Sequence, residues 1–268
     1  MRKKPTISIL ILIFIILLSF VGGFFVSESA YTLNSKAILE APSFSHLFGT
    51  DRLGRDLFSR VVEGGKISLF IGFASAFVAS LVGLIIGISA GFFGKLIDKS
   101  VVVLIDLFLT FPTFFLLLAL VSYISASALT LIIVISITGW MSMARLIRSE
   151  SFSISNQPFI KVLKLANVSK TKIIFKYFAP LIAPIFLISF TFSVSGAILA
   201  ESGLSFLGIG VMPPQISWGN IMAEGKEVID IAWWVSFFPG LMIFLVTFSL
   251  INICDYLQFL LNQKDIQS

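Results

Sequence analysis

The sequence is poor in the residues that build soluble domains and reactive sites. Charged residues occupy 12% of its 268 positions, about half the share that is typical of a soluble domain, whereas 57% of the residues are hydrophobic. The mean hydropathy of +1.02 therefore indicates an integral membrane protein. The single cysteine, Cys254, excludes an internal disulfide and a cysteine zinc site, and the single histidine, His46, excludes a site built from several histidines.

The chain also lacks an energy source of its own. A P-loop has the pattern GxxxxGK[ST], but in the stretch ending in "GGKIS" Arg60 stands at the first glycine position and Ile67 at the last position. No series of acidic or histidine residues runs through the apolar segments, as an ion-driven carrier would need. We therefore expect no cofactor and no enzymatic activity, and any uphill transport must draw energy from another subunit.

Six apolar runs predict an all-α, polytopic membrane protein, because about 20 residues are needed to cross the hydrocarbon core. The runs are Ile7 to Val26, the segment between Lys66 and Lys95, two helices within Ser100 to Ala144 joined by a turn at Ser122 to Ala128, the segment from Lys176 to before Glu201, and Ile231 to Cys254. A cleaved signal peptide is the rival interpretation of the first run, which is too long for the usual apolar part of such a peptide.

The positive charges predict the orientation of these spans. With the N-terminus inside, 13 of the 19 lysines and arginines fall in cytoplasmic segments. They are Arg2, Lys3, Lys4, Lys95, Lys99, Arg145, Arg148, Lys161, Lys164, Lys170, Lys172, Lys176 and Lys264. Because cytoplasmic loops are enriched in Lys and Arg, we expect both termini in the cytoplasm. The net charge of +5 then reflects topology, and we expect no nucleic-acid partner.

Two features of the apolar runs concern helix packing. Gly83, Gly87 and Gly91 recur every four residues and predict a smooth helix face that a neighbouring helix approaches closely. In "LIDLFLTFPTFF", Pro112 should kink the third span, and Asp106 places a carboxylate within it. We favour a structural ion pair, with Lys95 or Lys99 within reach of Asp106, or a hydrogen-bonded cap, over a transported-ion site.

The basic segment from Arg145 to Lys176 contains a candidate docking helix. Phe159 to Ala166 combines apolar residues with two lysines, and Asn167 tolerates the left-handed conformation that ends a helix. Such a helix fits either a groove in a partner protein or the headgroups of the lipid bilayer.

A second segment outside the spans is apolar but cannot form one straight helix. "LSFLGIGVMPPQISWGNIM", Leu204 to Met222, contains Gly208, Gly210, the pair Pro213-Pro214 and Gly219. Broken backbone at membrane depth is tolerated only where protein buries it or water wets it. We expect a re-entrant loop, in which Trp218 anchors at the interface between lipid and water.

Five ordered blocks give the chain a family resemblance. It resembles the inner-membrane permease subunits of bacterial ATP-binding-cassette (ABC) importers for dipeptides, oligopeptides and nickel, and in particular their C-type permease. The blocks are "HLFGTDRLGRDLFSRVVEGGKISL", "DLFLTFPT", "GWMSMARLIRS", "LSFLGIGVMPPQISWGNIM" and "WWVSFFPGLMIFL". The resemblance implies a type I importer permease fold. It divides the chain into a first span with an extracytoplasmic segment (1–66), the transmembrane core (67–258) and a short cytoplasmic tail (259–268).

The resemblance assigns roles to two segments. It implies an ATPase-coupling loop at Gln157, Phe159, Ile160, Lys161, Leu163, Lys164, Asn167 and Pro180, and an extracytoplasmic gate loop at Gly208, Gly210, Pro213, Pro214, Trp218 and Gly219. The coupling loop departs from the family pattern Glu-Ala-Ala, then Gly, then Pro. Here these positions hold Lys161, Val162, Leu163, Asn167 and Pro180, so only the proline is kept. A rigid plug at the rim is the alternative to a gate.

The expected function is that of a permease in the bacterial inner membrane. The resemblance implies that the chain is half of a pathway for short peptides, with a homologous second permease, two cytoplasmic ATPases, an extracytoplasmic solute-binding protein and membrane lipid as partners. Nickel or a nickel chelate is the alternative cargo. An ATP-independent channel or an ion-driven carrier is the rival from another class, and the scarcity of intramembrane charge disfavours it.

Overall fold

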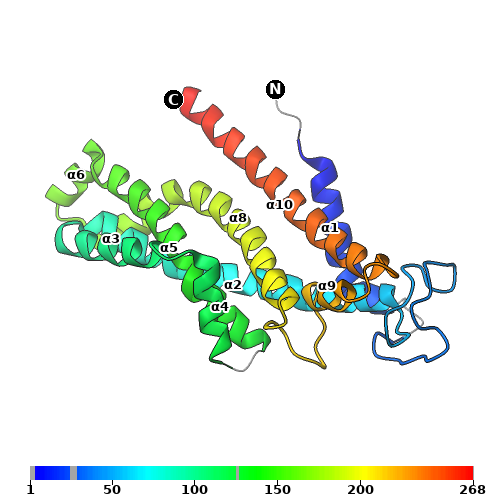
Figure 1. The fold of residues 1–268 in the computed structure, drawn as a ribbon. Coiled ribbons are helices and arrows are strands. Elements are labelled where there is room, and N and C mark those ends of the chain that lie inside the picture. Colours follow the sequence, from blue (N-terminus) through cyan, green and yellow to red (C-terminus); the bar gives the residue numbers. More distant parts are fainter. Residues whose placement is uncertain (1–3, 25–28, 125–126, 268) are drawn as a thin grey trace.

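The computed structural model describes residues 4–24, 29–124 and 127–267. Within these ranges the chain forms helices and loops, with one isolated antiparallel bridge between Thr50 and Asp56. The elements are α1 (Thr6–Val21), η1 (Gly22–Phe24), α2 (Leu57–Phe93), α3 (Lys95–Leu109), α4 (Thr113–Ser122), α5 (Ala128–Ser155), α6 (Pro158–Leu165), α7 (Lys170–Ile173), η2 (Ile174–Phe178), α8 (Ala179–Phe206), α9 (Trp218–Lys226) and α10 (Trp234–Gln267). The predicted all-α class is confirmed (Figure 1).

Four of the described helices are long and apolar enough to cross a membrane. They are Leu57–Phe93, Ala128–Ser155, Lys170–Phe206 and Trp234–Gln263, and the bent pair α3 and α4 adds a fifth if it counts as one span. α1 has 16 residues, fewer than the roughly 20 that span a bilayer, and the predicted end of its run at Phe25 and Val26 lies outside the described residues. The count of six spans stays a prediction.

Two helices continue past the predicted ends of their apolar runs. α8 does not end before Glu201 but continues to Phe206, and α10 continues beyond Cys254 to Gln267. The described part of the predicted tail is therefore helical. Charge and polarity suggested an earlier end in both cases, but a helix continues as long as each backbone N–H finds its carbonyl. The turn predicted at Ser122 to Ala128 falls between α4 and α5, and its residues 125 and 126 lie outside the described residues.

The third span is broken at Pro112 rather than only kinked. α3 and α4 are bent by 79°, and Pro112 lies immediately before α4, where its carbonyl accepts hydrogen bonds from the N–H groups of Phe115 and Leu116. Asp106 forms the predicted structural ion pair, but with Arg145 of α5 at 2.7 Å and not with Lys95 or Lys99. The packing of α3 against α5 supplies the nearer cation.

α2 is the central helix, and α5 and α8 pack along it. A Cβ atom at Gly83, Gly87 or Gly91 would come within 2.5–2.8 Å of a Cβ atom of α5, namely Met143, Ile147 or Ser151. The three glycines therefore lie along one close contact between α2 and α5. Such close approach needs glycine, because any side chain would force the two backbones apart.

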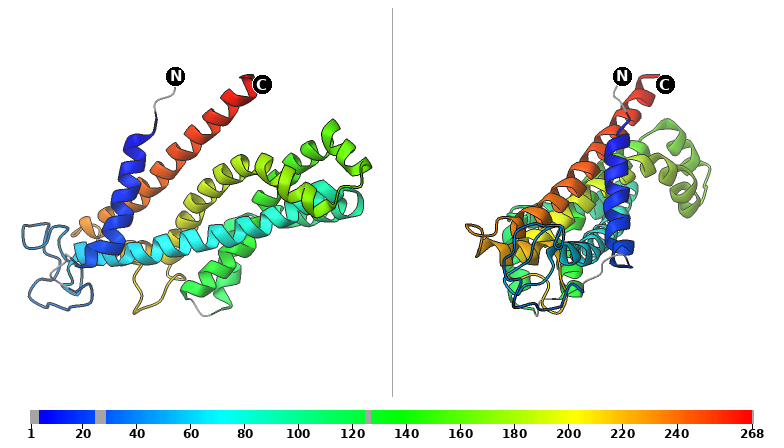
Figure 2. Two further views of the ribbon diagram at one scale, coloured as in Figure 1. Left: turned by 180° about the vertical axis from the view of Figure 1, so that it is seen from behind. Right: turned by 90° about the vertical axis from the view of Figure 1, so that its right-hand side faces the viewer.

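The two ends of the described chain lie on one side. α1 and α10 are in contact and run antiparallel, so the start of α1 and the end of α10 point to the same side, and the two helices diverge toward these ends (Figures 1 and 2). The loops of residues 29–56 lie at the far end of α2 from α6 (Figure 2). The largest buried apolar cluster joins α1, α2, α5, α8, α9 and α10, and a second cluster lies beneath α6.

Candidate functional site

The loop of residues 207–217, between α8 and α9, is buried at its base and exposed at its tip. Gly208 has φ +80°, a left-handed conformation that glycine adopts without strain. A Cβ atom on Gly210 would lie 1.9 Å from the hydroxyl oxygen of Ser205, so this turn also requires glycine. Val211 and Ile216 are buried, whereas Pro213 and Pro214 at the tip are exposed.

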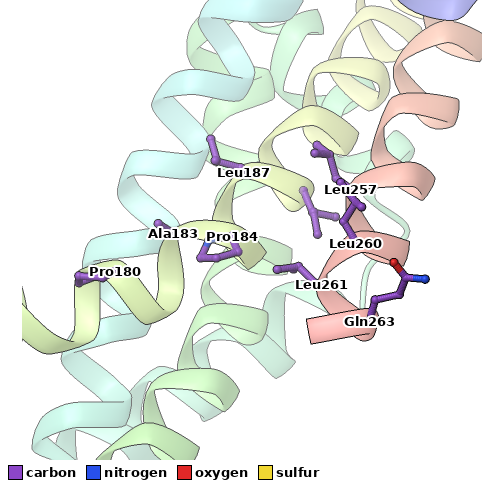
Figure 3. Close-up of a pocket in the computed structure, with 9 residues that line it drawn as sticks. Pro180, Ala183, Pro184, Leu187, Leu257, Leu260, Leu261 and Gln263 are labelled. Carbon is purple, nitrogen blue, oxygen red and sulfur yellow. The ribbon is translucent and has the colours of Figure 1, made fainter. Parts of the chain in front are cut away.

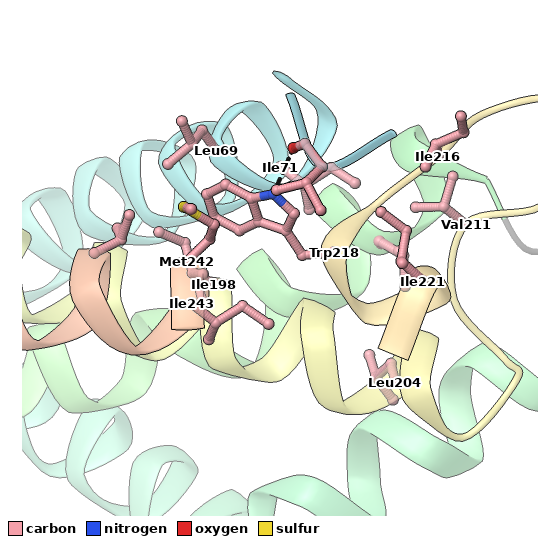
Figure 4. Packing of buried hydrophobic residues seen from close by; sticks show 14 of the residues in the cluster. Leu69, Ile71, Ile198, Leu204, Val211, Ile216, Trp218, Ile221, Met242 and Ile243 are labelled. Atoms are coloured by element: carbon pink, nitrogen blue, oxygen red, sulfur yellow. Dashed lines mark hydrogen bonds between the residues drawn. The ribbon is translucent and has the colours of Figure 1, made fainter. Parts of the chain in front are cut away.

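Trp218 is a core residue and not an interfacial anchor. Only 1% of it is exposed, and its indole N–H donates to the carbonyl oxygen of Val61 at 2.8 Å. It lies among apolar side chains of α2, α8 and α10, including Ile71, Ile198 and Met242 (Figure 4). The prediction of an anchor at the lipid–water boundary is wrong, because α9 turns its first residue inward. The next residue, Gly219, packs so closely on α8 that a Cβ would lie 2.6 Å from the carbonyl oxygen of Ser202.

A buried carboxylate, Glu201 of α8, lies beneath the loop. Glu201 is fully buried. One of its oxygens accepts a hydrogen bond from the hydroxyl of Ser68 on α2 at 3.0 Å, and the other accepts one from the hydroxyl of Ser205 at 2.7 Å. Ser202 donates a weaker bond at 3.4 Å. A buried carboxylate is costly unless such donors surround it.

The two serines connect this carboxylate to both ends of the loop. The Ser205 oxygen accepts the N–H of Val211 at 3.4 Å, and the Ser68 oxygen accepts the N–H of Trp218 at 3.1 Å. Each end of the loop backbone is thus one hydroxyl away from Glu201. Because Glu201 orients both serine hydroxyls that accept these N–H groups, we call Glu201, Ser68 and Ser205 the loop anchor.

A group of charged side chains joins the loops of residues 29–56 to α9. Arg55 donates to Asp51 at 2.6 Å and to Glu224 at 2.8 Å. Arg60, whose side chain is only 2% exposed, donates to Glu224 at 2.9 Å and lies 3.3 Å from Asp51. Each arginine therefore contacts both carboxylates, which fixes α9 relative to the start of α2. Nearby, His46 and Asp56 form a separate buried pair at 3.0 Å.

At the other end of the molecule, α6 packs one face inward and exposes the other. Ile160 is fully buried, whereas Phe159, Val162 and Leu165 are 41%, 62% and 83% exposed. Among the predicted coupling residues, Ile160 and Leu163 therefore pack on the chain's own second cluster. Within the predicted coupling loop, Ile160 therefore faces the chain's own core, and the surface open to a partner is on the opposite side of α6.

The remaining coupling residues border α6. Gln157 precedes the helix and Asn167 follows it with φ +53°, the left-handed conformation expected of that turn. Lys161 is exposed. Burial, followed by the charge of Lys161, lowers the pKa of Lys164. The Lys164 ammonium donates to the hydroxyl of Ser155 at 2.7 Å and lies 4.7 Å from the ring centre of Phe92.

Pro180 lies away from α6, at an apolar groove of about 450 Å³ between the start of α8 and the end of α10. Figure 3 shows Leu187 of α8 and Leu257 and Leu260 of α10 along this groove. The structure thus places the predicted coupling residues in two neighbourhoods. Those of α6 lie together, and Pro180 belongs to the helix that follows.

The sequence interpretation missed Glu201, Ser68 and the arginine–carboxylate group. A signal was present: Glu201 and Ser205 are four residues apart, which places them on one face of a helix. That signal was lost because Glu201 was taken as the end of a span. Ser68 carried no signal, since a serine in an apolar run is ordinary.

The structure combines a broken apolar helix, a short helix with exposed apolar residues at one end and an anchored loop at the other. This arrangement is typical of a transport permease. The family model for "Binding-protein-dependent transport system inner membrane component" matches residues 83–264. The oligopeptide transport system permease protein OppC of Haemophilus influenzae is 31% identical over 266 residues, 98% of this chain and 86% of that protein. The dipeptide transport system permease protein DppC of Bacillus subtilis is 33% identical over 264 residues, 98% of this chain and 82% of that protein.

A solved structure shares the fold. An inward-facing structure of the MetNI methionine ABC transporter superposes with a TM-score of 0.57 at 16% sequence identity, over 74% of this chain and 96% of that chain. The chain belongs to the family of binding-protein-dependent transport system inner membrane components. It is therefore the permease subunit of an ABC importer of the inner membrane. ATP hydrolysis lies in partner subunits, as in the other members of the family.

Proposed function

We propose that the chain forms half of the pathway by which short peptides enter the cell. The observation that carries this proposal is the identity of 31–33% to permeases named for oligopeptides and dipeptides, over 98% of the chain. In this proposal a second, homologous permease supplies the other half of the pathway. Two cytoplasmic ATPases supply energy, and an extracytoplasmic binding protein delivers the cargo.

The exposed side of α6 is the proposed docking element for an ATPase. Phe159, Val162 and Leu165 present apolar surface at the end of the molecule where Lys and Arg predict cytoplasm. A short amphipathic helix of this kind fits a groove in a partner. Closure of the ATPases on ATP would move α6 and, through the second cluster, the cytoplasmic ends of α5 and α8.

The loop of residues 207–217 is the proposed gate at the extracytoplasmic mouth. The tip of this loop is exposed, and its base is hydrogen-bonded to the helices beneath it. These features favour a loop that keeps one shape while the helices beneath it move. A static plug at the rim is the alternative. Reconstituted transporters with Pro213→Ala and Pro214→Ala would separate the two. A gate predicts slower uptake and faster ATP hydrolysis without cargo, and a plug predicts that neither rate changes.

The cargo is tested by uptake in a strain that lacks the chromosomal copy of this gene. Restoring the gene should restore uptake of a labelled dipeptide, while uptake of radioactive nickel should stay at the level of the deletion strain. Nickel uptake that depends on the gene, with no peptide uptake, would overturn the proposed cargo. A variant with Leu165→Asp, at a position outside the membrane core, tests in the same strain whether uptake depends on α6.

The orientation is tested by thiol labelling in a background with Cys254→Ala. A cysteine at Lys164 should react only with a reagent supplied from the cytoplasmic side, and one at Gln215 only with a reagent supplied from outside. Both positions are exposed in this chain. Labelling of the two cysteines from the same side would contradict the proposed topology.

A further inference from the structure

One side of α3, which we call the outer face of α3, combines exposed apolar residues with a lysine. It borders an open groove of about 480 Å³, and its residues are Leu96, Lys99, Ser100, Val103, Leu104 and Leu107. Their spacing of three or four residues places them on one side of the helix. All four of the apolar residues among them are exposed. The outer face therefore points away from α2 and α5, the helices on which α3 packs.

The acidic residues of α3 lie on its other side and pair with α5. The Asp98 carboxylate accepts a hydrogen bond from Arg148 at 2.8 Å, and the Asp106 carboxylate accepts one from Arg145 at 2.7 Å. Each acidic residue is thus balanced by an arginine of the neighbouring helix. The negative charges of α3 are therefore not available to the lysines of its outer face.

Two lysines lie at the start of α3. Lys95 and Lys99 are four residues apart and share one side of the helix. Both are exposed, and neither forms an ion pair with any residue that the structure describes. α3 begins at the same end of the molecule as α6 (Figures 1 and 2), where the Lys and Arg bias predicts cytoplasm. The two uncompensated charges therefore lie at the proposed cytoplasmic surface of the membrane.

The length of the outer face matches one leaflet of a bilayer. From Lys99 to Leu109, the last residue of α3, the helix rises by about 15 Å at about 1.5 Å per residue. The hydrocarbon core of a bilayer is about 30 Å thick, so each leaflet contributes about half of it. The chain then breaks at Pro112, and α4 departs at 79°. The straight apolar face thus ends at roughly the depth at which an acyl chain from one leaflet ends.

A phospholipid supplies both kinds of contact that the outer face offers. Its phosphate pairs with lysine, and its acyl chain covers Val103 and Leu107. An apolar helix from another subunit would cover the same leucines and valine but would leave the Lys99 ammonium desolvated and without an acid, which is costly. The charge of the two lysines favours a lipid with net negative charge over a zwitterionic one, by about fivefold for each lysine near the membrane surface.

We propose that the outer face of α3 binds an anionic phospholipid of the cytoplasmic leaflet. Its phosphate lies between Lys95 and Lys99, and one acyl chain follows Val103 and Leu107. The choice of leaflet rests on the proposed orientation, and nothing in the inference rests on the cargo. Because two arginine–aspartate pairs tie α3 to α5, and α5 leads into α6, the bound lipid stabilises the helix pair that carries the proposed docking element.

The test uses the complete transporter, with its second permease and ATPases, in vesicles of phosphatidylcholine. Two photoreactive probes carry the same diazirine-bearing acyl chain, one on phosphatidylglycerol, which is anionic, and one on phosphatidylcholine, which is zwitterionic. After illumination, mass spectrometry measures the probe bound to residues 96–109. Two lysines at about fivefold each predict that the anionic probe labels this segment roughly 25-fold more than the zwitterionic probe. The wild type alone therefore tests the proposal.

Lys99→Gln removes one of the charges while keeping most of the side-chain stem. Because Lys99 is exposed, the fold should be unchanged, and labelling by the anionic probe should fall about fivefold. Lys172→Gln is the matched control, because Lys172 is an exposed lysine of α7 that does not line the groove, and it should leave labelling by both probes unchanged. Salt at about 1 M, which shortens the screening length to about 3 Å, should remove most of the preference for the anionic probe.

Three outcomes would overturn the proposal. Equal labelling of the segment by the two probes would show that the outer face contacts lipid without selecting its charge. No labelling by either probe would show that another subunit covers this face. Equal losses in Lys99→Gln and Lys172→Gln would show a general attraction to the protein surface and not a site. A wrong orientation is detected separately, by the thiol labelling of cysteines at Lys164 and Gln215.

Discussion

Glu201→Ala should free the loop of residues 207–217 at both ends. The change removes the acceptor of the Ser68 and Ser205 hydroxyls. Without it, the two hydroxyls are no longer held in the orientation in which their oxygens accept the N–H groups of Trp218 and Val211. With about 1 kcal/mol for each of two lost hydrogen bonds, the free energy of local opening should fall by about 2 kcal/mol. Because 1.4 kcal/mol corresponds to a factor of ten, the open loop becomes roughly 30-fold more populated.

A buried cysteine in the loop measures this opening. Val211 is 4% exposed, so in a Cys254→Ala background a cysteine at Val211 reacts with a thiol reagent only when the loop opens. Its labelling rate should rise roughly 30-fold in Glu201→Ala, by the estimate above. A cysteine at Met212, which is already 52% exposed, should react at the same rate with or without Glu201.

Glu201→Gln is the matched control for the carboxylate. An amide keeps one acceptor oxygen and nearly the same volume, and serine hydroxyls rotate to suit a donor or an acceptor. The labelling rate of the cysteine at Val211 should therefore change by less than about threefold, since less than one hydrogen bond is lost. Equal labelling of that cysteine in Glu201→Ala and the parent would refute the loop anchor.

On α6, Leu165→Asp should prevent co-purification of the ATPase while the amount of protein inserted in the membrane stays unchanged, because Leu165 is exposed. Ile160→Asp should instead lower the yield of folded protein, because it buries an unpaired charge. Glu224→Gln should lower the free energy of unfolding by about 1–3 kcal/mol, less than the loss of a fully buried pair, because the Glu224 side chain is 38% exposed. Adding Arg60→Met to this variant should recover part of the loss, because it removes the charge left without that partner. Gly83→Leu should reduce the yield of folded protein, since its Cβ would lie 2.8 Å from a backbone oxygen of α5.

Features that depend on short stretches of chain were predictable from the sequence. The all-α class follows from the lengths of the apolar runs, and a bend at Pro112 follows from a missing N–H and a ring that clashes with the preceding turn, although the bend of 79° is larger than the predicted kink. Asn167 and Gly208 adopt left-handed conformations where a helix ends and a turn begins, as residues of these types allow. In each case the cause lies within one or two turns of the residue itself.

Features that depend on contact between distant residues were decided only by the tertiary structure. Ser68 and Glu201 are 133 positions apart, and Trp218 reaches a carbonyl 157 positions earlier in the chain. Whether a tryptophan faces lipid or core, or a glutamate ends a helix or lies buried in it, depends on what packs against that helix face. The apolar pattern determines that a helix crosses the membrane, but a pattern apolar on every side does not determine which face meets which neighbour.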